Sequence, residues 1–508
     1  MKNKINTLFI LLLALVVSCD VDLEDTNIDP NNSQTAGDAQ TLSSAIGYMG
    51  YIVEADLNYS NSFLWSQYYT WGNGVAIGNA ERYVSQAGDN NGYWFRTYAT
   101  SLTDLNYIVN TSNSEAYKGI ANVLKAYLFQ GLVDHFGDIP FTEALSGAIE
   151  DGSVLTPKYD SAETIIYPGL VTVLDEALEQ LNNADEDEVG RIGPDDFIYY
   201  DEVLMRTDIS KWIKFANSLK LRVLMRTSET SPQGPAIQNL INSGTFIESV
   251  ADMPAIPFSG ATGDQNPMFA IASSGVGNFY FASNGTLDLL ESLNDPRGQV
   301  FYSKATTGTA AGTLRGIDQG SIDNEPFTAP GSDYSLASPY SYSATNSVIL
   351  MSPWEVWFLR AEADARYGTS DDAETAFSTA ITLNFSYTGL TELDPVTMVD
   401  VPFNPASYIS SLNFAGATTL DNQIDLIGVQ KWISFNGTQE DEGWIESRRF
   451  DRPASRLFTD GGIFQTPSLS VLPSGVHPST WLYPESERSL NPNVLPQRQI
   501  TDAIFWDN

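Results

Sequence analysis

Three stretches in the first half of the chain repeat apolar residues at spacings of three and four. Within residues 116–136 the repeating apolar positions are Ile120, Val123, Leu124, Tyr127, Leu128, Leu132 and Val133. Residues 163–181 and 211–226 show the same spacing. Such spacing places the apolar side chains on one face of a helix with 3.6 residues per turn. The pattern therefore predicts amphipathic helices and a mainly helical region over residues 41–227.

The helical pattern is lost between residues 228 and 347. Gly, Ser, Pro and Asn there alternate with single aromatic residues, and only short helices are expected, such as one over residues 286–293. Long irregular stretches of folded proteins often form binding surfaces. The aromatic residues also argue against disorder. We therefore expect residues 228–347 to be a loop-rich region that binds a ligand.

Helical periodicity returns in residues 354–385, which partly match a tetratricopeptide unit. Trp357 and Phe377 occupy consensus positions of such a unit. About three units are needed to build a solenoid, so the helical stretches at residues 116–137 and 423–449 are candidate companions.

These patterns predict one large domain over residues 41–508. Its mainly helical parts are residues 41–227 and 348–460, its loop-rich part is residues 228–347, and residues 461–508 form a closing segment. A chain of 508 residues with 42% hydrophobic content is long and apolar enough to bury a core of that size.

The first 18 residues have the features of a bacterial secretion signal. Two lysines precede ten uninterrupted apolar residues, which is about half the length of a membrane span. A serine and Cys19 follow, and the sequence VVSC resembles a lipobox, whose cysteine becomes the acylated N-terminus of the mature protein. We therefore expect residues 1–18 to be removed, Cys19 to carry the lipid anchor, and the acidic residues 19–40 to form a flexible tether.

The formal net charge of −37 argues against two classes of partner. A field of this sign repels nucleic acid and anionic lipid headgroups, so neither is expected to bind. Cys19 is the only cysteine, and therefore no intrachain disulfide can form.

The sequence offers little support for an enzyme or a metal site. Its two histidines, His135 and His477, lie far apart without cysteine partners, and no nucleophile elbow, phosphate-binding loop or zinc motif is present. The acidic run at residues 185–188 lacks the alternating ligands and the glycine of a calcium loop, so a solvated turn is favoured there. We therefore expect no catalytic residues, no metal ligands and no cofactor, with a structural calcium ion as the open alternative.

Six blocks, in order along the chain, resemble the SusD/RagB family of outer-membrane lipoproteins from Bacteroidetes. They are YLFQGLVDHFGDIPFTEAL (127–145), KWIKFANSLKLRVLMR (211–226), NDPR (294–297), WFLRAEA (357–363), QKWISFNGTQEDEGWIESRRFDRP (430–453) and LYPESERSLNPN (482–493). No single block is specific to this family, but the ordered set of six blocks, together with the lipobox, is specific to it. Most of these residues are interpreted as scaffold, with Trp432 and Trp444 in the core and Arg448 and Arg449 bridging helices or carboxylates.

This resemblance implies both a fold and a function. The fold would be predominantly α-helical and SusD-like, with tetratricopeptide-like helix pairs packed against a loop-rich ligand-binding half. The protein would be a non-catalytic lipoprotein on the extracellular face of the outer membrane, held there by Cys19. It would bind oligosaccharides or polysaccharides and deliver them to a SusC-like TonB-dependent transporter, for which it acts as a lid.

An aromatic-rich stretch at residues 61–83 is the candidate ligand site. Sugars stack their C–H faces on aromatic rings, and their hydroxyl groups bond to polar side chains nearby. The candidates in this stretch are Trp65, Tyr68, Trp71, Asn73, Arg82 and Tyr83. The family resemblance implies that the middle region supplies the opposite wall, with candidates Asn278, Phe279, Tyr280 and Asn284. Because Trp65 and Tyr68 are three residues apart, the alternative that they are helix core stays open.

Two other functions stay open at this point. A RagB-like member of the same family would capture oligopeptides in a roomy cleft that pairs with the peptide backbone. A surface glycoside hydrolase would turn over its substrate and lose that activity when one carboxylate is removed. The 12% aromatic content favours a glycan without deciding the matter.

Overall fold

A computed structural model describes residues 36–71, 78–147, 154–273, 280–321, 333–394, 397–452, 458 and 462–507. Cys19 and the tether up to residue 35 therefore lie outside the described residues. The first described helix begins at Asp38.

The chain folds mainly into α-helices, as the sequence predicts. The longer ones are α3 (Asp38–Tyr51), α6 (Thr103–Thr111), α7 (Glu115–Phe136), α8 (Tyr167–Asn183), α10 (Ile209–Arg226), α11 (Gly234–Ser243), α15 (Pro353–Tyr367), α16 (Ala373–Thr388), α18 (Leu420–Phe435) and α19 (Glu440–Phe450). The three apolar stripes correspond to α7, α8 and α10. Helix α7 begins where the Ser114 hydroxyl accepts the N–H of Tyr117, and it ends at Gly137, which has a φ of 76°.

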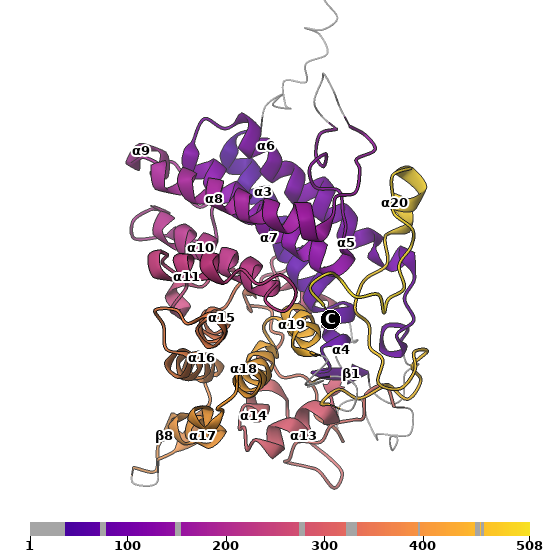
Figure 1. The fold of residues 1–508 in the computed structure, drawn as a ribbon. Helices are drawn as coiled ribbons and strands as arrows, with labels where there is room; N and C mark the ends of the chain where they lie inside the picture. Colours follow the sequence, from indigo (N-terminus) through magenta and orange to yellow (C-terminus); the bar gives the residue numbers. More distant parts are fainter. Residues whose placement is uncertain are drawn as a thin grey trace, which may run out of the picture.

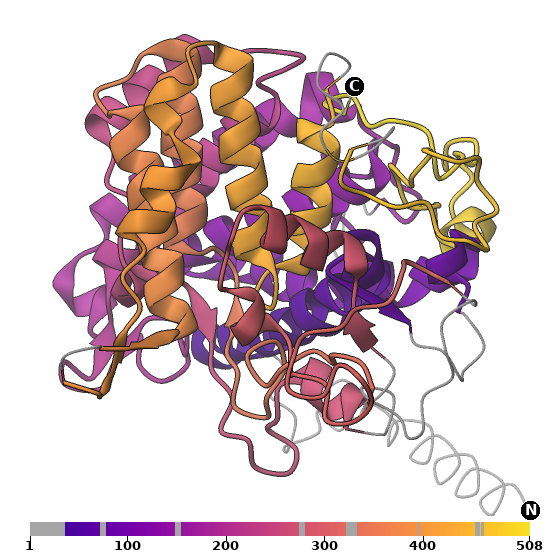
Figure 2. The ribbon, with the colours of Figure 1, turned by 90° about the horizontal axis from the view of Figure 1, so that it is seen from below.

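Helix pairs stack along one side of the molecule (Figure 1). Helix α7 packs against α8, α10 lies against both, and α18 packs against α15 and α19. Helices α15 and α16 form the helix–turn–helix pair predicted for residues 354–385. Figure 2 shows the helices of the C-terminal half (orange) on one side and the closing segment (yellow) on the other. The expected fold class, predominantly helical with paired helices against an irregular half, is confirmed.

Buried charge pairs join these helices. Arg222 of α10 donates a hydrogen bond to Glu355 of α15 at 2.6 Å, and Arg449 of α19 donates to Glu362 of α15 at 2.6 Å. The side chains of both pairs are almost fully buried. Trp444 is only 1% exposed. The interpretation of these motif residues as scaffold is confirmed, since arginines bridge the helices around a core tryptophan.

Shorter elements lie between and beside these helices. The short helices are α4 (Asn61–Trp65), α5 (Asn91–Arg96), α9 (Glu186–Val189), α12 (Pro267–Ala272), α13 (Asn284–Ser292), α14 (Gly298–Phe301), α17 (Ala406–Leu412) and α20 (Glu485–Leu490). The π-helical and 3-10 turns used below are η2 (Ile52–Asn58) and η3 (Ala80–Arg82). Helix α13 corresponds to the short helix predicted at residues 286–293. Helix α11 is longer than any helix expected in residues 228–347.

The strands form small two-stranded sheets. They are β1 (Tyr69–Trp71) with β5 (Tyr280–Ala282), β2 (Tyr200–Asp201) with β3 (Arg206–Thr207), β4 (Ala255–Ile256) with β6 (Val348–Ile349), and β7 (Thr391–Leu393) with β8 (Asp400–Pro402). The first of these sheets joins the early aromatic stretch to the middle region of the chain, and it positions the candidate site.

Candidate functional site

The pairing of β1 with β5 brings together two of the predicted ligand residues. The strands run antiparallel, and Trp71 lies opposite Tyr280 in the register. Their ring centroids are 4.8 Å apart and the ring planes are 81° to each other. These two residues are 209 positions apart in the chain, so the contact depends on the fold and not on local structure.

Further aromatic rings support this pair from beneath. The Tyr280 ring lies 5.4 Å from that of Tyr59 and 5.0 Å from that of Phe63, both edge to face. Tyr280 is 7% exposed, whereas Trp71 and Tyr59 are partly exposed. Burial raises the pKa of Tyr59 to about 12, so its hydroxyl stays a neutral hydrogen-bonding group at any physiological pH. The cluster therefore presents one edge of a packed aromatic layer at the surface.

A buried carboxylate, Glu81, fixes the position of β1. Its Oε2 accepts the backbone N–H of Trp71 at 2.9 Å. Its Oε1 accepts the Thr70 hydroxyl at 2.5 Å, the Gln319 amide at 2.8 Å and the Gly320 N–H at 2.9 Å. Glu81 is 1% exposed, and burial raises its pKa to about 7. One side chain thus ties η3, β1 and the segment after residue 317 together directly behind the Trp71 ring.

Three other predicted ligand residues lie inside the core. Tyr68 has no exposed surface, and its hydroxyl donates to the carbonyl of Trp432 at 2.5 Å. Trp65 is 2% exposed, and its ring centroid lies 5.2 Å from that of Trp444. Tyr83 is 2% exposed, and its hydroxyl lies 3.0 Å from Nδ1 of His477. In this conformation the three rings support the site from within and offer no face to a ligand. For Trp65 and Tyr68 this matches the alternative that their spacing left open, namely that they are helix core.

The remaining predicted residues lie at the margins of the site or outside the described residues. Asn284, at the start of α13, is half-buried and donates to Asp318 at 2.6 Å. Arg82 is also half-buried, and its carbonyl accepts the N–H of Val471 at 2.9 Å. Asn73, Asn278 and Phe279 lie outside the described residues, and their predicted role stays a prediction.

Sequence reasoning missed Tyr59, Glu81 and Gln319. Tyr59 stands just before the aromatic stretch that drew attention, so a wider window would have included it. Glu81 is one of 63 acidic residues and carries no distinguishing local pattern. Gln319 meets Glu81 across 238 positions of sequence, a contact that only the fold creates.

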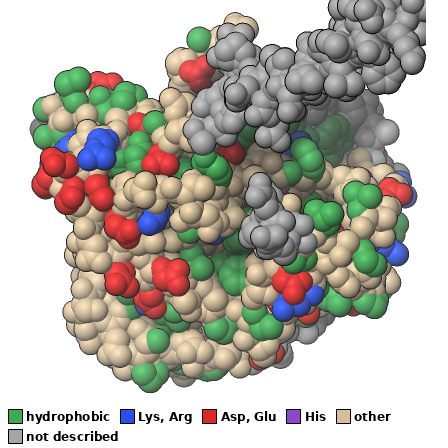
Figure 3. Space-filling view, turned by 90° about the horizontal axis from the view of Figure 1, so that it is seen from above, with side chains coloured by type: hydrophobic (Ala, Val, Ile, Leu, Met, Phe, Trp, Pro, Cys, Tyr) green, Lys and Arg blue, Asp and Glu red, His purple; other side chains and the backbone are tan. Residues whose placement is uncertain are grey.

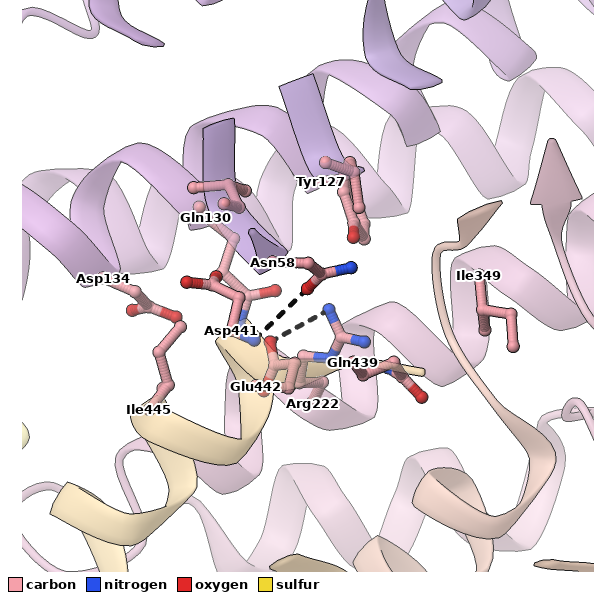
Figure 4. A pocket seen from close by; sticks show the side chains of 13 residues that line it. Asn58, Tyr127, Gln130, Asp134, Arg222, Ile349, Gln439, Asp441, Glu442 and Ile445 are labelled. Atoms are coloured by element: carbon pink, nitrogen blue, oxygen red, sulfur yellow. Dashed lines mark hydrogen bonds and ion pairs between the residues drawn. The ribbon is translucent and has the colours of Figure 1, made fainter. Parts of the chain in front are cut away.

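A pocket elsewhere in the molecule is too small to be the ligand site. It measures about 30 Å³ and lies where η2, α7, α10 and α19 meet (Figure 4). In it the Asn58 side chain accepts the N–H of Asp441 at 3.2 Å, and Arg222 lies 3.4 Å from Glu442. Sites for small ligands usually measure several hundred Å³. This pocket therefore belongs to the scaffold.

The acidic run at residues 185–188 has structural partners. Asp185 caps α9 by accepting the N–H of Glu188, and Glu188 accepts the N–H of Glu115 at the start of α7. Within the described ranges, no group of three or more His, Cys, Asp or Glu side chains that could hold a metal ion is found.

A family model described as "Starch-binding associating with outer membrane" matches residues 30–473, which is most of the chain. This protein belongs to the SusD-like family. Members of that family are binding proteins associated with the outer membrane. None of the helices in the described part of the chain is long and apolar enough to span a bilayer.

Solved structures share the fold of this SusD-like protein. A chitin-binding protein is 23% identical, with a TM-score of 0.72 over 93% of this chain and 100% of that chain. A SusD/RagB-family protein from Bacteroides thetaiotaomicron is 21% identical, with a TM-score of 0.71 over 93% of this chain and 99% of that chain. A chitin-binding SusD homologue from Flavobacterium johnsoniae is 19% identical, with a TM-score of 0.69 over 93% of this chain and 97% of that chain. No curated protein matches the sequence.

Proposed function

We propose that this SusD-like protein captures glycan chains at the cell surface and passes them to a SusC-like TonB-dependent transporter, over which it closes as a lid. The observation that carries the proposal is the Trp71–Tyr280 pair, a partly exposed indole held edge to face against a buried ring. A partly exposed indole suits the C–H face of a pyranose ring. Asn73, Arg82, Asn278, Phe279 and Asn284 are proposed as its hydrogen-bonding and stacking neighbours.

The site favours a glycan over an extended peptide. A peptide that adds to a sheet needs free backbone groups on the edge strand. On β1 the N–H of Trp71 is bonded to Glu81, and the carbonyl of Tyr69 accepts the Gln319 amide at 3.2 Å. Little of the β1 backbone is therefore left for peptide pairing, whereas the indole face needs none of these groups.

The remaining parts of the proposal concern location and chemistry. Acylation of Cys19 would anchor the protein at the outer face of the outer membrane, because several acyl chains make attachment durable. The protein would bind and release its cargo without turnover. A binding face that is open to solvent suits modest affinity and release to the transporter.

Isothermal titration calorimetry tests this function. The mature chain without its lipid is titrated with neutral and acidic polysaccharides, including chitin oligosaccharides and starch, and with a mixed peptide digest. We expect saturable binding to a neutral glycan that Trp71→Ala abolishes. The matched control is Phe95→Ala, because Phe95 is 64% exposed on α5 and lies outside the aromatic cluster. Binding heat that appears only with peptides would assign the protein to the peptide-capturing class. An equal loss of glycan binding in both variants would refute the Trp71 site.

A further inference from the structure

A short hairpin presents three consecutive large apolar side chains to solvent. Strands β2 and β3 are joined through residues 202–205. Within that connection Val203 is 91% exposed, Leu204 57% and Met205 72%. Single exposed apolar residues are common on protein surfaces, but three in a row at one tip are typical of a contact site. We call these three residues the apolar tip.

The backbone of the apolar tip donates hydrogen bonds to the side chain of Asp201. Oδ1 of Asp201 accepts the N–H of Val203 at 2.8 Å and that of Leu204 at 2.9 Å. Met205 takes the left-handed backbone conformation, with a φ of 54°. A tip that is ordered before binding loses little conformational entropy when a partner covers it.

The base of the hairpin is anchored in the core. The N–H of Thr207 donates to the carbonyl of Ile192 at 2.9 Å, and its hydroxyl donates to the buried carboxylate of Asp196. The indole of Trp212 donates to the same carboxylate at 2.7 Å. The base of the hairpin is therefore tied to the start of α10.

The apolar tip lies at the same end of the molecule as the start of the described chain. Asp38 at the start of α3 accepts the Ser112 hydroxyl at 2.7 Å, just before α7 begins. The first turn of α7 is bonded to Glu188 of α9, and Glu186 of α9 is paired with Arg206 of the hairpin. A continuous path of contacts thus joins the chain start to the hairpin.

The length of the preceding chain limits how far this end of the molecule can lie from the membrane. Residues 19–35 separate Cys19 from the first described residue. Seventeen residues span at most about 60 Å, whatever their conformation. With Cys19 acylated, a membrane-embedded protein beside the anchor is within reach of the apolar tip.

Charge around the apolar tip selects a protein over a lipid surface. Glu202 precedes the tip in the chain and is exposed, as are Asp187 and Glu186 of α9, the latter paired with Arg206 of the hairpin. Acidic side chains gather along one side of the face seen in Figure 3. Anionic headgroups would be repelled by these carboxylates. A protein pocket that is apolar inside and basic at its rim fits both the tip and its border.

We propose that Val203, Leu204 and Met205 form the docking element by which this protein binds its SusC-like transporter, inserting into an apolar pocket with a basic rim. The proposal rests on the proposed function, which supplies the transporter as partner. It adds the surface and the chemistry of the contact.

The test uses the full-length lipidated protein and the detergent-purified SusC-like transporter of the same bacterium. The variant is Val203→Asp combined with Leu204→Asp. The control is Leu490→Asp, because Leu490 is 78% exposed on α20, away from the hairpin (Figure 1). We expect the tip variant to bind the transporter roughly tenfold more weakly or worse, as loss of a central anchor does. The control should stay within about twofold of the wild type, and both variants should keep the wild-type Tm and glycan affinity.

Three results would overturn the proposal. Equal transporter affinity of tip variant and wild type would show that the transporter binds elsewhere. An effect confined to protein-free vesicles of outer-membrane lipid, or to self-association measured by analytical ultracentrifugation, would assign the tip to lipid or to a second copy. Failure of the wild type itself to bind the transporter would refute the proposed delivery function as well, and this result is distinct from the other two.

Discussion

Glu81 offers the sharpest test of how the site is built. Its carboxylate lies behind Trp71, is 1% exposed and accepts four hydrogen bonds. Burial raises its pKa from 4.5 to about 7. The substitution Glu81→Gln keeps the shape of the side chain, removes the charge and replaces one acceptor oxygen by a donor.

The effect on stability depends on pH in a defined direction. A carboxyl whose pKa is raised on folding contributes stability that is complete below the unfolded value of 4.5 and is lost as the pH rises through about 7. A change of pKa of this size corresponds to roughly 3 kcal/mol, most of which falls between pH 5 and pH 8. Glutamine does not titrate. Relative to the wild type, Glu81→Gln should therefore gain roughly 2–3 kcal/mol in the free energy of unfolding over that interval.

Glycan binding by Glu81→Gln should be weaker than that of the wild type. The amide oxygen can keep the three bonds made by Oε1, so the amide nitrogen then faces the N–H of Trp71. Two buried donors in contact cost about 1 kcal/mol or more, and the contact is relieved when β1 shifts away from residue 81. Because Trp71 is part of β1, this shift should raise the Kd for a glycan. Urea unfolding at pH 5 and pH 8, with calorimetry on the same samples, measures both quantities. A stability difference that is equal at the two pH values, or an unchanged glycan affinity, would refute this account of Glu81.

Further predictions concern the scaffold and the anchor. Glu362→Gln removes one of the two buried carboxylates paired with Arg449, which keeps Glu446, and it also removes a partner of Arg366. It should lower the free energy of unfolding by about 3 kcal/mol in urea titrations. In the partly exposed pair with Lys220, Asp175→Asn should cost less than about 1 kcal/mol, and a similar loss in both variants would contradict the burial argument. Burial lowers the pKa of His477 from 6.5 to about 4. The stability that its neutral ring contributes is therefore present above pH 6.5 and is lost as the pH falls through about 4. His477→Gln should flatten acid unfolding curves between these two pH values. In a strain without the transporter, Cys19→Ser should move the protein from the membrane fraction to the soluble fraction on immunoblots, and unchanged membrane retention would contradict the lipid anchor.

The helical part of the fold could be predicted because its signal is local. In α7 and α8 every turn repeats the apolar stripe, so period alone locates the helices. The hydrogen bond between Gln319 and Glu81 has no such signal, because it joins segments far apart in the chain. A contact of that kind becomes visible only when the packing of the whole molecule is known.

The candidate site was predictable only in outline. Composition and family resemblance selected both Trp71 and Tyr280, and the β1–β5 pairing places them opposite each other. The same reasoning could not tell that Trp71 is partly exposed whereas Trp65 is buried. Between them Gln67 adopts a left-handed φ of 60°, a conformation for which glutamine gives no sequence signal. That turn ends α4 with Trp65 in the core and starts β1, from which Trp71 reaches the surface.

The most direct test of the central claim is a crystal structure of the protein with an oligosaccharide that binds in calorimetry. The account predicts a pyranose ring stacked on the Trp71 indole beside Tyr280, with β1 still bonded to Glu81. A glycan bound at another surface, with the Trp71 face uncovered, would contradict it.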